Sequence, residues 1–520
     1  MWQSFNRYVA RLIQAVIIGI SALLLFYLSV QLLRLQAYMP LTRLEDMIFI
    51  RQQPSVLIEV GVGLLLLVAL APLLKKIPPH HLFLGCALLY LLAGYGLISH
   101  VDSVIRADAK RVFEAALAMN QGDFSSFTKQ GAYLYLHPHQ LGLVTLERFY
   151  LLFSSSPRFI FGVNPILVLA TLGLQAAICH KLYHKGLVTN YLILLSFTFL
   201  PQFFFILFAY GAIPGAFLIV LATYFFLKDQ QSHRLTWAIL GILMAVFAGI
   251  VRNNYQIFLI ALFILWLMAY GKTLSKRYLK LPLALLVSFF LLSKLLTFSY
   301  EMAIGQPLSP GVPKLAYVTM GLQEDPKGAV GGWWNTYNTN LLKKVGYDQT
   351  LAKEKARTDL KQALGRLASD AGYASKFFRD KFHSTWLDPT FQSIWTGPLT
   401  ARGQYTHTSL LKSIYEEGTG YAVLNRLGGV WLWLVYSLAA VYWLCRSRQT
   451  AGRSLRLFEY LPFLFFIGGV LFHLIWETKS QYVPVYVSLL TQPAAYSLAY
   501  IAERLMRKVK KIGSLSTVVG

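Results

Sequence analysis

The sequence predicts an all-α polytopic membrane protein with about twelve transmembrane helices and a large extracellular loop domain, and three observations support this fold class. First, 56% of the 520 residues are hydrophobic and only 14% are charged, whereas soluble domains have about 45–50% apolar and about 25% charged residues. Second, apolar runs of the roughly 20 residues needed to cross a bilayer recur along the chain. Third, basic residues gather in alternate connections between these runs, as cytoplasmic loops do.

The apolar runs define the candidate spans in chain order. They fall near 12–33, 55–74, 82–99, 164–182, 187–208, 212–227, 235–251, 254–270, 281–298, 427–445, 458–476 and 482–500. The first run is too long for a removable signal peptide and lacks a small-residue cleavage site, so we expect it to be a retained span.

The basic residues predict the orientation of the spans. The chain has 48 Lys and Arg residues against 23 Asp and Glu residues, a net charge of +25. With the N-terminus in the cytoplasm every inner connection is basic, and an even number of spans returns the C-terminus to the same side. We therefore attribute the charge to membrane topology and expect no nucleic-acid partner. The scattered Cys86, Cys179 and Cys445 predict neither a disulfide framework nor a zinc site.

Two long connections between spans set the domain organisation, because loops of more than about 12–15 residues are uncommon unless they are functional. Both lie on the expected outer side. The predicted parts are 1–99 with three spans, 100–163 as an extracellular loop with an acidic motif, 164–298 as a six-span core, 299–426 as an extracellular domain, and 427–520 with three spans and a basic cytoplasmic tail.

Carboxylates that follow the third span are the first candidates for catalysis. Asp102 and Asp108 come directly after this span, and Glu114 follows on a helix expected over about Ala107 to Met119. A carboxylate at the membrane rim can accept a proton from an incoming hydroxyl or help to bind a divalent cation. The alternative interpretation is that Asp108 only caps the start of the helix.

A pair of histidines comes next in the same loop. His137 and His139 stand two positions apart, just before an apolar stretch. Two imidazoles can bind a metal ion, but a zinc site takes at least three protein ligands. The alternative is that both are ordinary surface or core histidines.

Two short outer connections contain candidate phosphate ligands. Lys479 and Tyr482 lie with Glu477 in the last outer loop, and Arg252 lies at the turn between two earlier spans. Cationic side chains form strong hydrogen bonds with phosphate. The alternatives are anchoring of Lys479 and Tyr482 in the headgroup zone and an ordinary turn with one exposed cation at Arg252.

The order of these motifs resembles a known family. The matching stretches are Ala107-Asp108, Val112 to Ala116, Gly122-Asp123-Phe124, Tyr133 with His137 to Gly142, and Glu477 to Tyr482, which is similar to an E-x-(R/K)-S-R-Y segment. They resemble bacterial polyprenyl-phosphate-sugar-dependent glycosyltransferases of the GT-C fold, related to protein O-mannosyltransferases (glycosyltransferase family 39) and of Gram-positive type. Gln481 replaces a common arginine, and Ala109 replaces a second acidic or amide residue.

The resemblance implies a function and roles for the candidate residues. A sugar would move from a polyprenyl-phosphate donor to a hydroxyl of a cell-envelope glycan, teichoic acid or lipid-linked acceptor at the outer face of the cell membrane. Asp108, with Asp102 as second choice, would be the catalytic carboxylate. Lys479, Arg252 and Tyr482 would bind the donor phosphate. Residues expected near the acceptor or behind the site are Glu114, His137, His139 and Glu477. No cofactor is certain, and a divalent cation, Mg²⁺ or Mn²⁺, stays open.

Two other classes of membrane protein remain alternatives. A transporter or flippase for lipid-linked sugars would use the same basic rim and lipid groove without a carboxylate base. A glycan polymerase or ligase would take a pyrophosphate-linked oligosaccharide and should have an outer site richer in arginine. A purely structural or sensory protein leaves the two long outer segments unexplained.

Overall fold

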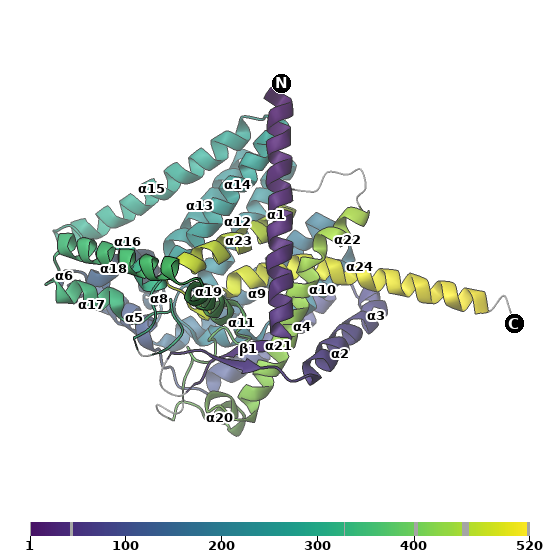
Figure 1. The fold of residues 1–520 in the computed structure, drawn as a ribbon, viewed down its shortest axis with the longest axis horizontal. Coiled ribbons are helices and arrows are strands. Elements are labelled where there is room, and N and C mark those ends of the chain that lie inside the picture. Colours follow the sequence, from purple (N-terminus) through teal and green to yellow (C-terminus); the bar gives the residue numbers. More distant parts are fainter. Residues whose placement is uncertain (1, 42–44, 327, 400–403, 450–456, 517–520) are drawn as a thin grey trace.

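The computed structural model describes residues 2–41, 45–326, 328–399, 404–449 and 457–516, and these residues form a helical bundle (Figure 1). The long apolar segments are helical because a segment inside a bilayer must satisfy its backbone hydrogen bonds internally. The all-α polytopic class is therefore confirmed. Among the described residues, the antiparallel pair β1 (Leu35–Tyr38) and β2 (Ile48–Arg51) is the one sheet.

Nine helices in the described part of the chain are long and apolar enough to cross a membrane. They are α1 (Trp2–Leu32), α2 (Ser55–Ala69) continued by α3 (Ala71–Lys76), α4 (Pro79–Ser99), α9 (Pro157–Tyr183), α12 (Ala212–Ser232), α14 (Gln256–Thr273) with the preceding turn, α15 (Arg277–Ile304), α21 (Thr419–Ala440), and α23 (Leu461–Ile475) with the preceding turn.

Three further helices match the remaining predicted spans less well. α10 (Gly186–Phe197) makes a tenth span if it is counted with the short helix α11 (Leu200–Phe204) and the turn after it, against which it is bent by 54°. α13 (Leu235–Val251) is apolar but shorter. α24 (Pro484–Ser516) has 33 residues, but tyrosines, serines and glutamine dilute its apolar first half. Nine or ten of the twelve predicted spans therefore have the length and composition of membrane helices.

The longer segments between spans gather at one end of the bundle, which we call the loop side. Its described residues are 33–41, 45–54, 100–156, 305–326, 328–399, 404–418 and 476–483. Its helices are α5 (Ala107–Asn120), α6 (Ser125–Thr128), α7 (Tyr133–Leu136), α8 (Leu141–Leu151), α16 (Lys314–Gly321), α17 (Tyr337–Lys344), α18 (Gln349–Ser369), α19 (Ala371–Trp386) and α20 (Ser409–Tyr415). In Figure 1 they lie at the left and bottom, whereas the N-terminus is at the top and the C-terminus at the right. The short α22 (Tyr442–Gln449) lies near α24.

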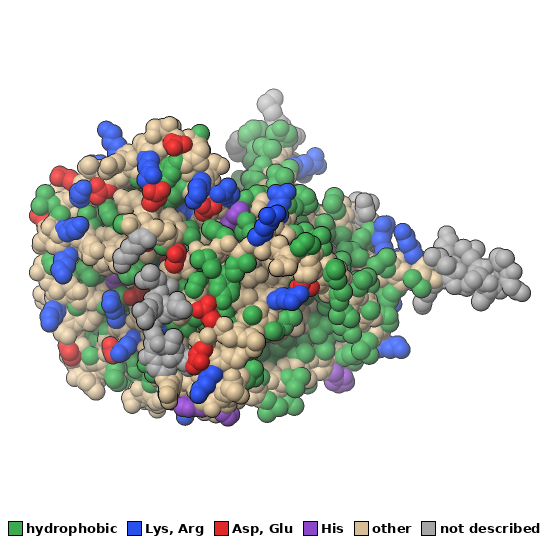
Figure 2. Space-filling model, turned by 60° about the horizontal axis from the view of Figure 1, so that its bottom comes forward, with side chains coloured by type: hydrophobic (Ala, Val, Ile, Leu, Met, Phe, Trp, Pro, Cys, Tyr) green, Lys and Arg blue, Asp and Glu red, His purple; other side chains and the backbone are tan. Residues whose placement is uncertain are grey.

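The surface divides in the same way as the fold. Figure 2 shows most charged side chains over the left of one face, and hydrophobic side chains over much of the rest. Leucines on α2 and α4, such as Leu65 and Leu89, are exposed by more than half. Large exposed apolar surfaces mark contact with a partner or a membrane. Together with the long apolar helices, they indicate a multi-pass membrane protein.

Candidate functional site

The connection between α23 and α24, Trp476 to Tyr482, is called the 476–482 segment. It lies at the centre of a buried polar cluster on the loop side. The cluster consists of Glu45, Arg252, Gln392, Glu477, Lys479 and Tyr482. Its backbone is extended at Lys479, with φ −153° and ψ 151°, before a single 3₁₀ turn, Ser480–Tyr482. The Thr478 amide donates to the Gly332 carbonyl oxygen at 3.0 Å. This pairing fixes the segment against the chain before α17. Because side chains two positions apart in an extended segment lie on the same side, Glu477 and Lys479 share one side of it.

Lys479 forms the central ion pair of the cluster, with Glu45. Its Nζ lies 2.6 Å from Glu45 Oε2, with the two side chains only 10% and 13% exposed. The second oxygen of Glu45 accepts a hydrogen bond from Gln392 Nε2 at 3.0 Å. Although burial opposes it, the charges of Glu45 and Glu477 raise the pKa of Lys479 above its usual value. The ammonium is therefore charged throughout the physiological range.

Glu477 is a buried carboxyl beside this pair. Its Oε1 accepts a hydrogen bond from the Tyr482 hydroxyl at 3.2 Å. Burial raises the pKa of Glu477 to about 7, although Lys479 and the Tyr482 hydrogen bond act in the opposite direction. The cluster thus contains one carboxyl that changes charge near neutral pH.

Replacing Glu477 with Gln should flatten the dependence of stability on pH. Because the pKa is raised on folding, from 4.5 to about 7, Glu477 stabilises the fold fully below pH 4.5, and this contribution is lost as the pH rises to about 7. The loss is on the order of 3 kcal/mol. Thermal unfolding in detergent between pH 4.5 and 7 measures it, with the exposed Glu114→Gln as control. Equal slopes for wild type and Glu477→Gln would contradict this assignment.

Arg252 follows α13 and supplies a second buried cation, 7% exposed. Its Nη1 donates to the Tyr210 carbonyl oxygen at 2.9 Å. The guanidinium lies over the rings of Tyr210 and Tyr482, at 4.8 and 5.6 Å from their centroids. Among the described residues no carboxylate forms an ion pair with it. A buried guanidinium held by aromatic rings and one carbonyl is suited to an anionic ligand, because burial of a charge without a counter-charge is costly.

Asp108 lies in the first turn of α5, near the cluster. The helix begins where the sequence predicted, and Arg106, not Asp108, occupies its N-cap position. The cap interpretation of Asp108 is therefore wrong, and its carboxylate is exposed in the first turn. Its charge adds to the effect of burial in raising the pKa of Tyr210, and it is among the charges that raise the pKa of Lys479. The structure thus brings Asp108 within electrostatic reach of the ion pair.

The histidine pair borders the cluster in neutral form. His137 Nδ1 lies 2.8 Å from the Tyr317 hydroxyl. Burial, with the charge of Arg111, lowers the pKa of His137 to about 4, and burial, with His137 and Lys314, lowers that of His139 to about 3. In the described part of the chain, no group of three or more His, Cys, Asp or Glu side chains is placed to hold a metal ion.

Two of the predicted residues lie outside the cluster. Asp102 is half exposed and pairs with His407, whose Nε2 lies 2.9 Å from Asp102 Oδ1. Glu114 is exposed on α5 and pairs with Lys110 one turn earlier, at 3.6 Å. Both pairs are of the exposed kind that contributes little free energy.

Glu45 and Gln392 are the members of the cluster that the sequence analysis missed. The signal for Glu45 was present, since Glu45 and Asp46 form an adjacent acidic pair in the outer connection between the first two spans. Asp46 accepts hydrogen bonds from the backbone amides of Met47, at 2.7 Å, and Val330, at 3.2 Å. Its carboxylate therefore stabilises the local backbone. Gln392 carries no local signal, because its contact with Glu45 joins residues 347 positions apart.

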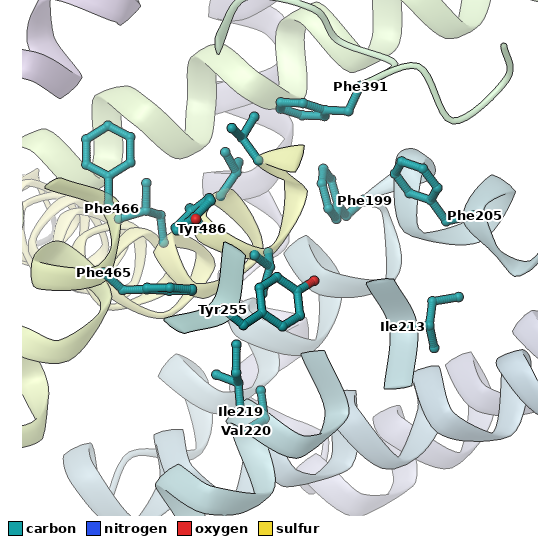
Figure 3. Packing of buried hydrophobic residues seen from close by; sticks show 14 of the residues in the cluster. Phe199, Phe205, Ile213, Ile219, Val220, Tyr255, Phe391, Phe465, Phe466 and Tyr486 are labelled. Atoms are coloured by element: carbon teal, nitrogen blue, oxygen red, sulfur yellow. The ribbon is translucent and has the colours of Figure 1, made fainter. Parts of the chain in front are cut away.

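A largely apolar cavity adjoins the cluster. Its lining comes from α9, α11, α12, α24 and the turns beside them, and comprises Val168, Thr171, Phe199, Gln202, Phe205, Ala212, Ile213, Ala216, Val220, Tyr255, Gln481, Pro484, Val485 and Ser488. Figure 3 shows Phe199, Phe205 and Tyr255 among these packed residues. Gln481 and Tyr255 link the cavity to the cluster, being two positions from Lys479 and three from Arg252.

Comparison with known proteins finds no match for this chain among protein-family models, curated proteins or solved structures. The cluster and the adjoining cavity are therefore the basis on which a function is inferred.

Proposed function

We propose that the protein is a membrane glycosyltransferase that moves a sugar from a polyprenyl-phosphate donor to a hydroxyl group of an extracellular acceptor. The acceptor would be a cell-envelope glycan, a teichoic acid or a lipid-linked molecule. One observation supports this most: two buried cations, Lys479 and Arg252, lie two and three positions from Gln481 and Tyr255, which line an apolar cavity, and the Asp108 carboxylate is within electrostatic reach of Lys479. This combination matches a ligand with an anionic head and an apolar tail that reacts at the junction.

The donor phosphate would bind Arg252, Lys479 and Tyr482. Arg252 has only a carbonyl and two aromatic rings as partners within reach in the described residues, so a phosphate oxygen would supply its counter-charge. Lys479 would exchange part of its contact with Glu45 for the phosphate. Tyr482 would donate from its hydroxyl, which now bonds Glu477.

The prenyl chain would occupy the apolar cavity between α9, α12 and α24. Burial of each methylene group contributes about 0.8 kcal/mol, so even a few isoprene units give substantial affinity. The few polar atoms in the cavity, such as the Gln481 Oε1, which has no hydrogen-bond partner among the described residues, would lie near the head of the lipid.

The proposed reaction is a single displacement at the anomeric carbon of the sugar. The acceptor oxygen forms a bond to that carbon while the bond from the carbon to the phosphate oxygen breaks, so the configuration inverts. The proton of the acceptor passes to the exposed Asp108 carboxylate, and the lipid phosphate leaves with the bonding electron pair. Fixed cations in a partly buried site stabilise this departing charge more than water does.

The proposal places the loop side at the extracellular face, with both termini in the cytoplasm and twelve spans in all. Residues 299–426 would then form an acceptor platform over the site. His137 and Glu477 would orient groups around the reacting atoms, and no nucleic-acid partner is expected. Assays with and without Mg²⁺ or Mn²⁺ would settle the requirement for a divalent cation.

The test is the sugar composition of the cell envelope in a deletion strain. We expect one sugar substituent to disappear and to return with the wild-type gene, and its identity names the donor. Purified protein in detergent should then transfer the same sugar from its polyprenyl phosphate. A protein that restores the sugar in cells but has no activity in detergent, where no compartments exist, would be a flippase and would contradict the proposal.

A further inference from the structure

Lys381 on α19 is a fully buried lysine, 0% exposed, that contacts the start of the 476–482 segment. Its Nζ donates hydrogen bonds to three backbone carbonyl oxygens, of Gly321, of Leu474 at 3.0 Å and of Trp476 at 2.8 Å. An ammonium group has three donors, and here all three are used by the backbone.

The three carbonyl groups belong to the ends of two helices. Gly321 is the last residue of α16, and Leu474 and Trp476 are at the end of α23. Carbonyl groups in the last turn have no partner within their helix, and a helix C-terminus favours a nearby cation. Lys381 therefore satisfies two helix ends with one charge and joins α16, α19 and α23 at a single point.

Two glycines allow the backbone to approach Lys381 and the end of α23 closely. A Cβ atom on Gly332, whose φ is +79°, would lie 2.6 Å from Lys381 Cδ and Cε, and one on Gly321 would lie 2.5 Å from the Ile475 carbonyl oxygen. Both positions therefore require a residue without a side chain. The backbone therefore packs closely around the Lys381 side chain. A residue that only filled space in the core would not require such a close approach.

The same contacts determine how the 476–482 segment leaves α23. Trp476, whose carbonyl oxygen Lys381 binds, directly precedes Glu477. Thr385, one turn after Lys381, has its hydroxyl 3.1 Å from that of Thr478. Burial lowers the pKa of Lys381 to about 7, and the charge of Glu477 opposes this. Glu477 and His473 of α23 are the ionisable side chains linked electrostatically to Lys381.

We propose that Lys381 is a positioning residue for the phosphate site: its ammonium fixes the end of α23 and so the direction in which Glu477 and Lys479 project. The phosphate ligand in this statement rests on the proposed function, whereas the positioning of the segment rests on the contacts of Lys381 alone. The experiment therefore measures both.

The test replaces Lys381 with Met, which has an unbranched side chain but no donor. Hydrogen–deuterium exchange at residues 474–482 should become at least tenfold faster, and a short-chain polyprenyl monophosphate should bind at least tenfold more weakly. The matched control is Lys376→Met on the same helix, since Lys376 is exposed and pairs with the neighbouring Asp380 at 2.9 Å. That variant should behave as wild type in both measurements.

A spectroscopic readout separates positioning from simple packing. Because the charge of Lys381 lowers the pKa of Glu477, Lys381→Met should move the loss of the protonated-carboxyl infrared band to higher pH. The band is identified by its absence in Glu477→Gln. If the Met variant does not fold, Lys381→Gln, which keeps two N–H donors, replaces it and should show smaller changes of the same sign.

Each outcome decides one part of the inference. Unchanged exchange at residues 474–482 in a folded Lys381 variant would overturn the positioning role. Faster exchange with unchanged binding of the lipid phosphate would overturn its link to the phosphate site. If wild-type protein does not bind the lipid phosphate at all, the proposed function fails, and the exchange measurement still decides whether Lys381 positions the segment.

Discussion

Replacing Lys479 with Met is expected to lower sugar transfer by about 10³-fold, at the upper end of what removal of one charge-stabilising donor costs. Lys479 is 10% exposed in its side chain and is the cation at the heart of the cluster. In the proposed reaction the lipid phosphate gains negative charge as the sugar leaves. A fixed ammonium stabilises that charge without reorganising, and no water molecule or flexible surface lysine can replace it.

The measurement is a comparison of kcat/KM for transfer from a polyprenyl-phosphate sugar in detergent. Lys110→Met is the matched control, because Lys110 lies on α5 of the same loop side but is exposed and pairs with Glu114 at 3.6 Å. Lys479→Arg keeps the charge and should retain more activity than Lys479→Met. Wild-type activity in Lys479→Met would remove this residue from the phosphate site.

Loss of Lys479 also has an expected structural signature. Glu45 would keep its hydrogen bond from Gln392 but lose its ion pair, which leaves a buried carboxylate without a counter-charge. The thermal midpoint should therefore fall. The double variant with Glu45→Gln should recover stability but not transfer, which separates the effect on folding from the effect on the reaction.

Much of the fold was predictable because the membrane imposes a simple rule on the chain. Apolar runs of about 20 residues must be helical, and the described residues contain nine such helices, or ten with the bent pair. The helix expected from about Ala107 to Met119 is also present, as α5. α24 shows the limit: its polar and aromatic residues are buried against other helices, and composition alone does not reveal this packing.

The site was predictable in its parts but not in its assembly. Asp108 and Glu114 are six positions apart on α5, about one and two-thirds turns, so they face different directions. Which of them faces the cluster depends on how α5 packs on α8, a tertiary contact that the sequence does not encode locally. Asp102 lies outside the cluster, where it pairs with His407. The connection that contains Glu45, residues 34–54, is itself longer than about 12–15 residues, so the length criterion applied to the other outer loops also indicates this one.

Replacing Asp108 with Asn is expected to lower kcat by about 10²–10⁴-fold, the usual contribution of a general base. Asn has nearly the same shape, and Asp108 is exposed and does not cap its helix, so the fold and the binding of donor should change little. The measurement is kcat and KM for transfer together with the affinity for a polyprenyl monophosphate. Asp102→Asn is the matched control, since its carboxylate pairs with His407 away from the cluster.

Glu45 is the other carboxylate that could act as the base. If Asp108 is the base, replacing Glu45 should lower kcat less than replacing Asp108 does. Both carboxylate oxygens of Glu45 already accept hydrogen bonds, one from Lys479 and one from Gln392. Glu45→Gln frees Lys479 from its counter-ion and should leave donor binding equal or tighter, with a smaller fall in kcat than in Asp108→Asn. If Glu45→Gln abolishes transfer while Asp108→Asn keeps it, the phosphate must displace Glu45 from Lys479 during binding. The released carboxylate is then the base, and the ion pair seen here is the resting state of the site.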